Sequence, residues 1–567
     1  MDSRRFKTME EFILNYRAAE QNDLPIEKFA NILGLKPASV ERRKLSVKHG
    51  LGLELPDLPR MHEGSLKGRD SESVTDDEYN EFVKTKRKFI EIQEKFQLHE
   101  SKSKKKVYVI TAAQNATPVH AGFFASLLTY AQHNDAELMV IPLRYRNPTS
   151  IWSTKSREAD YWATSVLPYI VNKPTKLNEN MMVAGQMKIQ PTAVSPLSGL
   201  DAFTGESSGI FGHTSVQLVT VPTPAKKYPK LLATTGAVTI PNYTDTKTGF
   251  KGEFNHSLSA CIIEIDGDEF HQRHVSAMDD TGHFYDCDKY YTPKGVHKSE
   301  RIAALVTGDI HAEFHDPDVE KATYTAPDSI MNVLRPEVWV IHDLTDFYAR
   351  NHHHRGNDLL QFAKHHYGRN NVEEGLQVCA DFVDAHSRPD MLNMVVRSNH
   401  DEALDRWLRE AEPKSDPENA IFYHYMKMHQ YKNVRRHATG FESFDALEFW
   451  CNNPEAERGL RNTENTKFLK RDESFVVNGT ELSFHGDQGS NGGRGSIRSF
   501  AKVGPKTIIG HGHSPGIYQG AYQVGVSARK DLEYASGCSS WMHTHGIIYP
   551  DGHRTLVHIV NGKWRVS

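Results

Sequence analysis

Five short apolar runs in residues 299–567 each end in a cluster of Asp, Asn, His, Ser and Gly residues. The runs and the clusters after them are Ile302–Val306 with Gly308–His311, Val338–Ile341 with His342–Asp346, Met394–Val396 with Ser398–Asp401, Leu482–Phe484 with His485–Asp487, and Thr507–Ile509 with Gly510–His513. Short apolar runs bounded by turn residues predict buried strands. Because α/β proteins build their sites where strand ends meet at the rim of a sheet, we expect the clusters to converge.

The residue types in these clusters favour a divalent metal site. Aspartate, asparagine and histidine offer oxygen and nitrogen ligands that suit ions of borderline hardness. The candidate ligands are Asp309, His311, Asp343, Asn399, His485, His511 and His513. Histidines are concentrated in the same half of the chain, with 11 in residues 1–300 and 20 in residues 301–567. The five cysteines form no Cys-x-x-Cys pair, so neither a cysteine zinc site nor a disulfide scaffold is expected.

The ordered set of clusters resembles the calcineurin-like metallophosphoesterase superfamily. The motifs of that family read D-x-H, G-D-x-x-D, G-N-H-D, a lone histidine with glycine, and G-H-x-H, and they occur here in that order over residues 309–513. Two positions depart from the pattern, because His342 and Ser398 stand where the family usually has glycine. The resemblance covers residues 299–567 and does not extend to residues 1–298.

The resemblance implies a sandwich of β-sheets flanked by helices, with two metal ions and a bridging hydroxide. The first ion would be held by Asp309, His311, Asp343 and His513, and the second by Asp343, Asn399, His485 and His511, with Asp343 bridging. His400 would stabilise the transition state or protonate the leaving oxygen, and Asp401 would orient its imidazole. Manganese is the first choice of ion, while iron and zinc stay open because ligand type does not settle identity.

Residues 1–50 predict a helical unit whose spacing is typical of a helix-turn-helix. Ala30, Gly34 and Val40 are placed for a close helix crossing, a turn and an apolar anchor, and the second helix would begin near Pro37. That helix would present three basic side chains to DNA, Arg42, Arg43 and Lys44. The alternative is a plain helical hairpin with a solvated basic face.

Residues 51–105 predict a linker followed by an amphipathic helix at 76–99. The helix could serve homo-oligomerisation, but packing on the next domain is the simpler expectation. Residues 106–298 predict a central α/β domain that opens with a β-α-β unit, namely a strand at Val107–Ile110, a helix starting at Thr117–Pro118, and a strand at Leu138–Ile141. No internal repeat is evident, and this domain has no assigned role.

Three features favour DNA as the substrate: the N-terminal helical unit, the roughly 300 residues outside the metal domain, and a glycine-rich loop at Gly486–Gly495. Glycines let backbone approach a phosphate chain, and Arg494 and Arg498 lie nearby; the alternative for this loop is a flexible surface turn. Because the net charge is −4, nucleic-acid affinity must come from local patches. The expected function is metal-dependent hydrolysis of DNA. The alternatives are a nucleotide or phosphoprotein phosphatase of the same fold and a non-catalytic DNA-binding protein.

The whole chain also resembles tailed-phage pre-early proteins that degrade host DNA, through the combination of this domain with a long N-terminal extension. The resemblance implies a DNase of the infected bacterial cytoplasm. A cytoplasmic location also agrees with the polar N-terminus and with the lack of an apolar run of about 18 residues, so no membrane partner is expected.

Overall fold

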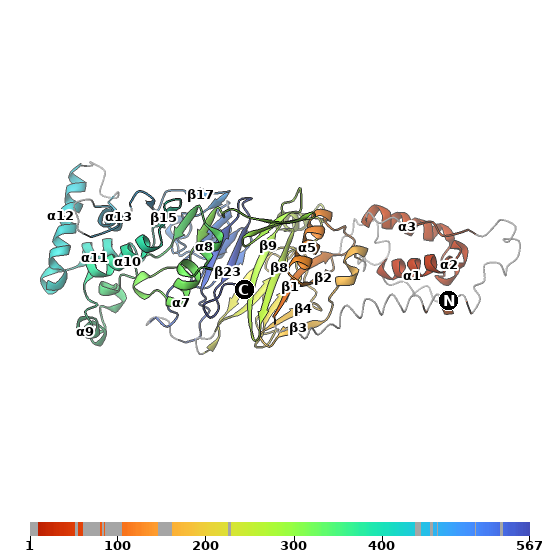
Figure 1. The fold of residues 1–567 in the computed structure, drawn as a ribbon, viewed down its shortest axis with the longest axis horizontal. Helices are drawn as coiled ribbons and strands as arrows, with labels where there is room; N and C mark the ends of the chain where they lie inside the picture. The colour runs from red at the N-terminus through yellow and green to blue at the C-terminus, as the bar shows by residue number, and fades with distance from the viewer. Residues whose placement is uncertain are drawn as a thin grey trace.

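The structure is a computed structural model of the chain, and it describes residues 9–51, 55–60, 77, 80, 81, 84, 105–145, 162–224, 228–436, 444–453, 458–461, 463–504, 506–532 and 537–566. Within these residues the chain is a mixed α/β protein with several sheets. Figure 1 shows an elongated arrangement, with three N-terminal helices at one end, the sheets in the middle, and a group of helices at the other end.

A ten-stranded sheet forms the central layer, in the order β17-β18-β19-β21-β20-β6-β7-β5-β4-β3. Its strands are β3 (Pro174–Asn178), β4 (Met181–Ala184), β5 (Ser208–Phe211), β6 (Leu218–Val221), β7 (Lys230–Thr234), β17 (Val476–Val477), β18 (Thr480–Glu481), β19 (Lys506–Ile509), β20 (Gly516–Tyr518) and β21 (Ala521–Gln523). The sheet therefore joins strands from two distant parts of the sequence, and β6 meets β20 through the antiparallel pair Leu218 and Ile517.

Two smaller sheets cover one face of this layer. One has the order β2-β1-β8-β9 and the other β16-β15-β14-β13-β22-β23. Their strands are β1 (Lys105–Gln114), β2 (Ala136–Leu143), β8 (Ser259–Asp266), β9 (Glu269–Ser276), β13 (Ala304–Val306), β14 (Val338–Ile341), β15 (Leu392–Val396), β16 (Thr466–Leu469), β22 (Thr544–Ile548) and β23 (Arg554–His558).

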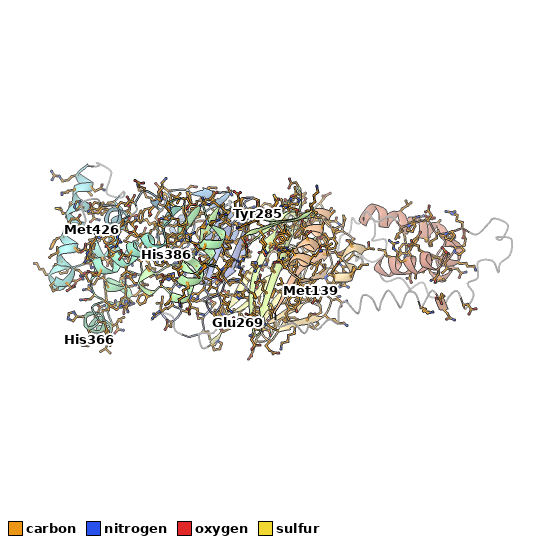
Figure 2. All side chains as sticks on the ribbon, in the orientation of Figure 1. Met139, Glu269, Tyr285, His366, His386 and Met426 are labelled. Carbon is orange, nitrogen blue, oxygen red and sulfur yellow. The ribbon has the colours of Figure 1, made fainter. Side chains whose placement is uncertain are left out.

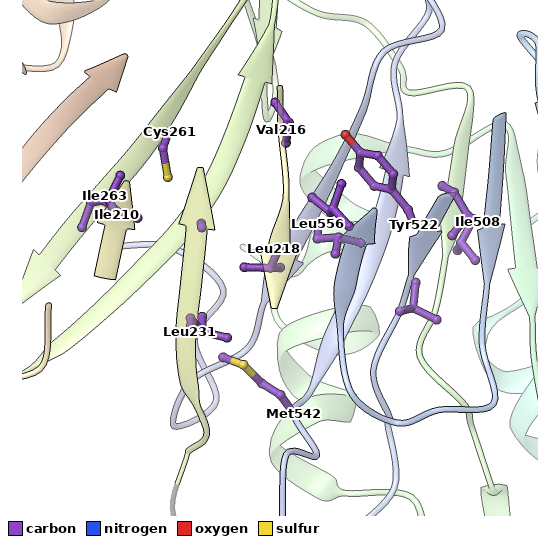
Figure 3. Packing of buried hydrophobic residues seen from close by; sticks show 14 of the residues in the cluster. Ile210, Val216, Leu218, Leu231, Cys261, Ile263, Ile508, Tyr522, Met542 and Leu556 are labelled. Atoms are coloured by element: carbon purple, nitrogen blue, oxygen red, sulfur yellow. The ribbon is translucent and has the colours of Figure 1, made fainter. Parts of the chain in front are cut away.

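One continuous apolar core lies between the layers. It includes Ile110 and Ile263 of the four-stranded sheet, Val306 of the six-stranded sheet, and Ile210 and Ile508 of the ten-stranded sheet. Figure 3 shows side chains from both halves of the chain meeting in this core. The expected boundary at residue 298 therefore does not separate two cores, because ladder pairing and apolar burial continue across it.

The opening of the central region has the expected β-α-β form. β1 and β2 pair in parallel, and helix α5 (Ala121–His133) connects them. The helix starts later than the expected Thr117–Pro118, because the His120 side chain caps it by accepting from the Phe123 N–H. A further small sheet follows the β8-β9 hairpin, made of β10 (Phe284–Asp286), β11 (Lys289–Thr292) and β12 (Gly295–Lys298).

Helices cover the outer face of the six-stranded sheet and fill one end of the molecule. Leu305, Trp339 and Val395 pack against α8 (Ile330–Leu334) and α10 (Val372–His386) in a second core. The helices between β14 and β17 also include α9 (Asp358–His366), α11 (Ala403–Glu410), α12 (Ala420–Arg436) and α13 (Ala446–Cys451). Figure 2 labels His366 and Met426 in this group, far from Met139 of β2.

The N-terminal unit consists of α1 (Met9–Gln21), α2 (Ile26–Ile32) and α3 (Pro37–Leu51). Its second and third helices have the expected helix-turn-helix order, with α3 starting at Pro37. Ala30 and Val40 are buried, and Gly34 has a φ of +64°, a left-handed conformation that glycine adopts without strain. Residues 55–60, expected to be linker, instead pack on the helices, because Leu55 and Leu58 are buried there.

The helix expected at 76–99 lies almost wholly outside the described residues, although Asp77, Asn80, Glu81 and Lys84 are helical. No helix in the described ranges is long and apolar enough to cross a membrane.

Candidate metal centre

Four of the five expected apolar runs form strands, and the cluster after each of these four follows the carboxyl end of its strand. β13, β14 and β15 lead to Asp309, Asp343 and Asn399, and β19 leads to His511. The fifth run differs from the expectation, because β18 ends at Glu481 and residues 482–484 continue without ladder pairing to His485. The site thus lies between the ends of two facing sheets.

The four residues expected to hold a first ion come together. One ligand atom from each of Asp309, His311, Asp343 and His513 lies within 4.8 Å of the others, and all four side chains are buried. The Nε2 atoms of His311 and His513 are 3.2 Å apart, and His513 Nε2 is 3.1 Å from Asp309 Oδ2. Two nitrogens on one tetrahedral ion, each about 2.0–2.1 Å from it, would lie about 3.3 Å apart, so the spacing suits a shared ion.

Of the residues expected for a second ion, His485 contacts Asp343, and His511 lies beside His485. His485 Nε2 lies 3.2 Å from Asp343 Oδ2, and the ring of His511 lies 5.3 Å from the ring of His485, centroid to centroid. Asn399 Oδ1 is buried and has no hydrogen-bond partner. Asp343 Oδ2 thus lies 3.6 Å from His311 Nε2 and 3.2 Å from His485 Nε2.

Unpartnered polar atoms are concentrated here. Buried atoms without a hydrogen bond include both carboxylate oxygens of Asp309 and Asp343, both ring nitrogens of His485, and Nδ1 of His513. Leaving a buried polar atom unpaired costs about 1–3 kcal/mol, more when it is charged. A set of orphaned oxygen and nitrogen ligands fits divalent ions, which would satisfy them together.

The buried charges shift the pKa values of the site residues. Burial by itself would lower the pKa of His485, but the neighbouring Asp343 and Asp309 raise it to about 9. Burial would also lower the pKa of His311, but Asp346, Asp343 and Asp309 raise it to about 9. Burial would raise the pKa of Asp343, yet the histidines around it hold its pKa well below the ordinary value. The cluster favours anionic carboxylates beside cations.

Strained backbone marks the same positions. His311, Asp343, His511 and His513 all have φ between +44° and +68°, in the left-handed region that costs a residue with a Cβ atom about 1–2 kcal/mol. Gly510 lies so close to Asp309 that a Cβ there would come within 2.3 Å of the Asp309 Oδ1 atom. Such strain persists where the surrounding fold forces it and is often found at functional sites.

Asp346 also lies at the cluster, although it is not among the candidate ligands identified from the sequence. Its Oδ1 lies 3.3 Å from His311 Nδ1 and 3.7 Å from His400 Nδ1, and these three residues form a second group with converging ligand atoms. The signal was present in the sequence, because Asp346 is the last residue of the D-x-x-D pattern that begins at Asp343.

His400 stands beside the cluster, but Asp401 does not orient it. The Asp401 carboxylate accepts from the Thr345 N–H and the Ser398 hydroxyl, whereas His400 faces Asp346. The reason is local: Asp401 lies in the turn after β15 and points back toward the loop after β14. Burial and the nearby Asp343 raise the pKa of Asp401 to about 7. Asp346, and not Asp401, is therefore the carboxylate that faces the His400 ring.

The two departures from the motif pattern lie next to the cluster without belonging to it. His342 is buried, and burial with the neighbouring His485 lowers its pKa to about 4. The Ser398 hydroxyl donates to Asp401. Two further histidines after the last motif, His543 and His545, are already hydrogen-bonded, to the Ala528 carbonyl and the Gly308 N–H respectively.

The predicted DNA contacts are split between two surfaces. Arg42 is exposed on α3, whereas Arg43 lies over the Phe12 ring and Lys44 contacts Asp57. Arg494 and Arg498 are both exposed in and after the glycine-rich loop, and the Arg498 guanidinium lies over the Tyr518 ring. These assignments remain predictions.

The fold and the site define a mixed α/β protein with a buried Asp/His cluster suited to metal. Compared with known proteins, the chain is 34% identical over 471 residues to protein A1 of Escherichia phage T5, covering 81% of this chain and 83% of that protein. The chain belongs to the family of that phage protein. No family model matches the sequence, and no solved structure matches it.

Proposed function

We propose that this protein is a metal-dependent phosphodiesterase that hydrolyses DNA, and that it acts on host DNA in the cytoplasm of phage-infected bacteria. The observation that carries the proposal is the convergence of Asp309, His311, Asp343 and His513, where the carboxylate oxygens of Asp309 and Asp343 are buried without a hydrogen bond. The motif order of the metallophosphoesterase superfamily supports the reaction class. The phage relative supports the biological setting.

The candidate ligands would hold the metal ions, and His400 would protonate the leaving oxygen. Asp309, His311, Asp343 and His513 would hold one ion, and Asp343, Asn399, His485 and His511 a second. When bound, a pair of divalent ions lowers the pKa of a water and neutralises phosphate charge. Manganese is our first choice, and iron and zinc are the alternatives.

We assign His400 to the protonation of the leaving group. Its side chain is 18% exposed at the edge of the buried cluster, and its Nδ1 faces Asp346. The opposite ring nitrogen is free to donate a proton to the oxygen that leaves phosphorus when water attacks and the phosphodiester bond breaks. Asp346 would fix the orientation of the ring.

The test is cleavage of supercoiled plasmid DNA in the presence of manganese, with a chelator control. We expect Asp343→Asn to lose bound metal and activity together. His400→Ala should keep its metal and lose turnover by about 100-fold or more, the range of general acid catalysis. His366→Ala on the exposed face of α9 is the matched control, and it should behave as the wild type.

The outcomes separate the alternatives. Loss of linear ends without nicking of circular DNA would indicate an exonuclease. Hydrolysis of a small chromogenic monoester without DNA cleavage would favour a phosphatase of the same fold. DNA binding with no hydrolysis of either substrate would favour a non-catalytic DNA-binding protein. Full activity in His400→Ala would overturn the role assigned to that residue.

A further inference from the structure

The two halves of the ten-stranded sheet have equivalent strand orders when each half is followed outward from the centre. Starting from β20, the strands run β20-β21-β19-β18-β17, and starting from β6 they run β6-β7-β5-β4-β3. The pairing senses also agree at every step: antiparallel, parallel, parallel and antiparallel in each direction. The antiparallel β6–β20 pair lies at the centre.

The covering layer repeats in the same way. β1 pairs with β2 in parallel and with β8 antiparallel, and β8 pairs with β9. β13 pairs with β14 in parallel and with β22 antiparallel, and β22 pairs with β23. Along the chain, β1 to β9 therefore correspond in order to β13, β14 and β17 to β23. The second set carries β15, β16 and the α9–α13 helices as an insertion.

Backbone contacts outside the ladders match as well. The Val238 N–H donates to the Ala112 carbonyl, and the Ser527 N–H donates to the Asp309 carbonyl. His120 and Asp316, the caps of the first helix in each set, donate their N–H groups to the carbonyls of Val238 and Ser527. Val238 and Ser527 each lie two residues after a glycine that packs closely against the next strand. A Cβ at Gly236 would strike Ser259, and one at Gly525 would strike Met542 and Thr544.

The first set of strands lacks the candidate metal ligands. Counting from the central pair, Gly212 and His213 fall where the second set has Gly510 and His511, but Ser215 falls in place of His513. Ala112 corresponds to Asp309, because its carbonyl accepts from the Val238 N–H as the Asp309 carbonyl accepts from the Ser527 N–H. The polar groups at these strand ends bond to one another instead: His213 contacts the Ser215 hydroxyl and the Gln190 carbonyl, both at hydrogen-bond distance.

We propose that residues 105–276 are a second copy of the sandwich that carries the metal centre, a copy without metal ligands that acts as a built-in partner for the other. In this arrangement one chain holds one metal centre. The ligand-free copy closes the β20 edge, which would otherwise expose unpaired N–H and C=O groups. The statement about metal rests on the proposed function, whereas the repeat rests on topology.

The ligand-free copy also supports the His513 loop. Thr223, just after β6, exchanges two backbone hydrogen bonds with Ser539. Two residues further on, the Trp541 ring packs edge-on against the His513 ring at 4.3 Å, and the Met542 N–H donates to the His513 carbonyl. A short path of contacts therefore runs from the ligand-free copy to a ligand, and it makes Thr223 a positioning residue.

The first experiment counts metal on the full chain by mass spectrometry after equilibration with manganese. Asp343→Asn and His511→Gln should lose metal, and His213→Gln, at the equivalent position, should keep it all. Metal retained by Asp343→Asn, or metal lost in His213→Gln, would overturn the claim that the first copy is ligand-free.

The second experiment compares Thr223→Pro, which removes the N–H that donates to Ser539, with Thr223→Ala, which keeps it. We expect Thr223→Pro to weaken manganese affinity about fivefold with the same number of ions at saturation, the effect of one lost hydrogen bond. Hydrogen exchange in chelator should rise in residues 510–515 and 539–542 of Thr223→Pro only. This readout stands even if the protein binds no metal, so the two proposals can fail separately. Equal exchange in both variants would overturn the positioning role.

Discussion

At the scale of single residues, the site combines left-handed backbone with buried polar atoms that have no hydrogen bond. The left-handed backbone at Asp343 and the close approach at Gly510 cost free energy that the fold supplies elsewhere. The cluster also leaves carboxylate oxygens of Asp309 and Asp343 and ring nitrogens of His485 buried without a hydrogen bond. Both features are explained together if these side chains were placed for a cation, because binding recovers the cost of leaving them unpaired.

Asp346 provides a sharp test at this scale. Asp346→Asn keeps the shape of the side chain but removes the charge beside His311 and His400. Loss of such an orienting carboxylate typically costs about 10–100-fold in metal affinity or activity. We expect that loss in manganese titrations and in DNA cleavage, with Asp390→Asn at an exposed ion pair as the control. An unchanged affinity together with unchanged turnover would remove Asp346 from the site.

At the scale of elements, partly buried ion pairs tie the loops of the site together. Arg471, after β16, pairs with Glu402 beside the His400 loop and with Asp487 in the glycine-rich loop. Burial would lower the pKa of the Arg471 guanidinium, but the two carboxylates raise it. Arg397 pairs with Glu402 as well, and with Asp405 and Asp445. The two loops that flank the cluster are thus fixed to each other through one guanidinium.

Arg471→Met should therefore loosen both loops. We expect a fall in kcat with little change in metal stoichiometry, and a loss of about 1–3 kcal/mol in unfolding free energy, since Asp487 would be left buried without its partner. Arg471→Lys should rescue the variant only in part, because an ammonium does not reproduce two parallel guanidinium bonds. Complete rescue by lysine would show that charge alone matters. Stability and steady-state kinetics measure both effects.

The helical unit and the glycine-rich loop give a second prediction at this scale. If Arg42 and Arg494 contact phosphates, Arg42→Ala and Arg494→Ala should each weaken DNA binding for every sequence. Each should also reduce the slope of log affinity against log salt by about 0.9. Fluorescence anisotropy over a salt series measures this slope, with exposed Lys251→Ala as the control. A slope equal to that of the wild type would assign the residue to a solvated surface.

At the scale of the whole molecule, the layers hold many neutral histidines in their cores. Burial lowers the pKa of His213 and His274 to about 4, and burial together with neighbouring histidines lowers that of His545 and His558 to about 3. An unfolded histidine titrates near 6.5, so the unfolded chain binds more protons than the folded chain between these values.

The contribution of these four histidines to folding stability is therefore complete above about pH 6.5 and is lost as the pH falls toward 4. Each such histidine contributes about 1.4 kcal/mol per pH unit across that window. We expect the urea midpoint, measured in chelator to exclude metal release, to fall steeply as the pH is lowered from 6.5 to 5.5. A midpoint that stays constant or rises over this range would contradict the neutral burial of these side chains.

The sequence by itself determined which donor groups the candidate site contains and much of its local structure. Apolar runs such as Val338–Ile341 became strands at the same bounds, because short apolar segments between turn residues have few other ways to bury themselves. The residues Asp309, His311, Asp343 and His513 were identifiable because ligand type and alternation are local properties. The turn at Gly34 and the start of α3 at Pro37 were local in the same sense.

Only the tertiary structure decided which distant parts share a sheet and which carboxylate faces His400. The partners of β20 and of the Asp401 side chain depend on contacts between residues far apart in the chain or on opposite sides of a loop, which periodicity does not encode. The repeated sandwich was hidden for a related reason. Two sequences can fill the same layers with different apolar residues of suitable volume, so the topology persists after the ligands and the similarity in sequence are gone.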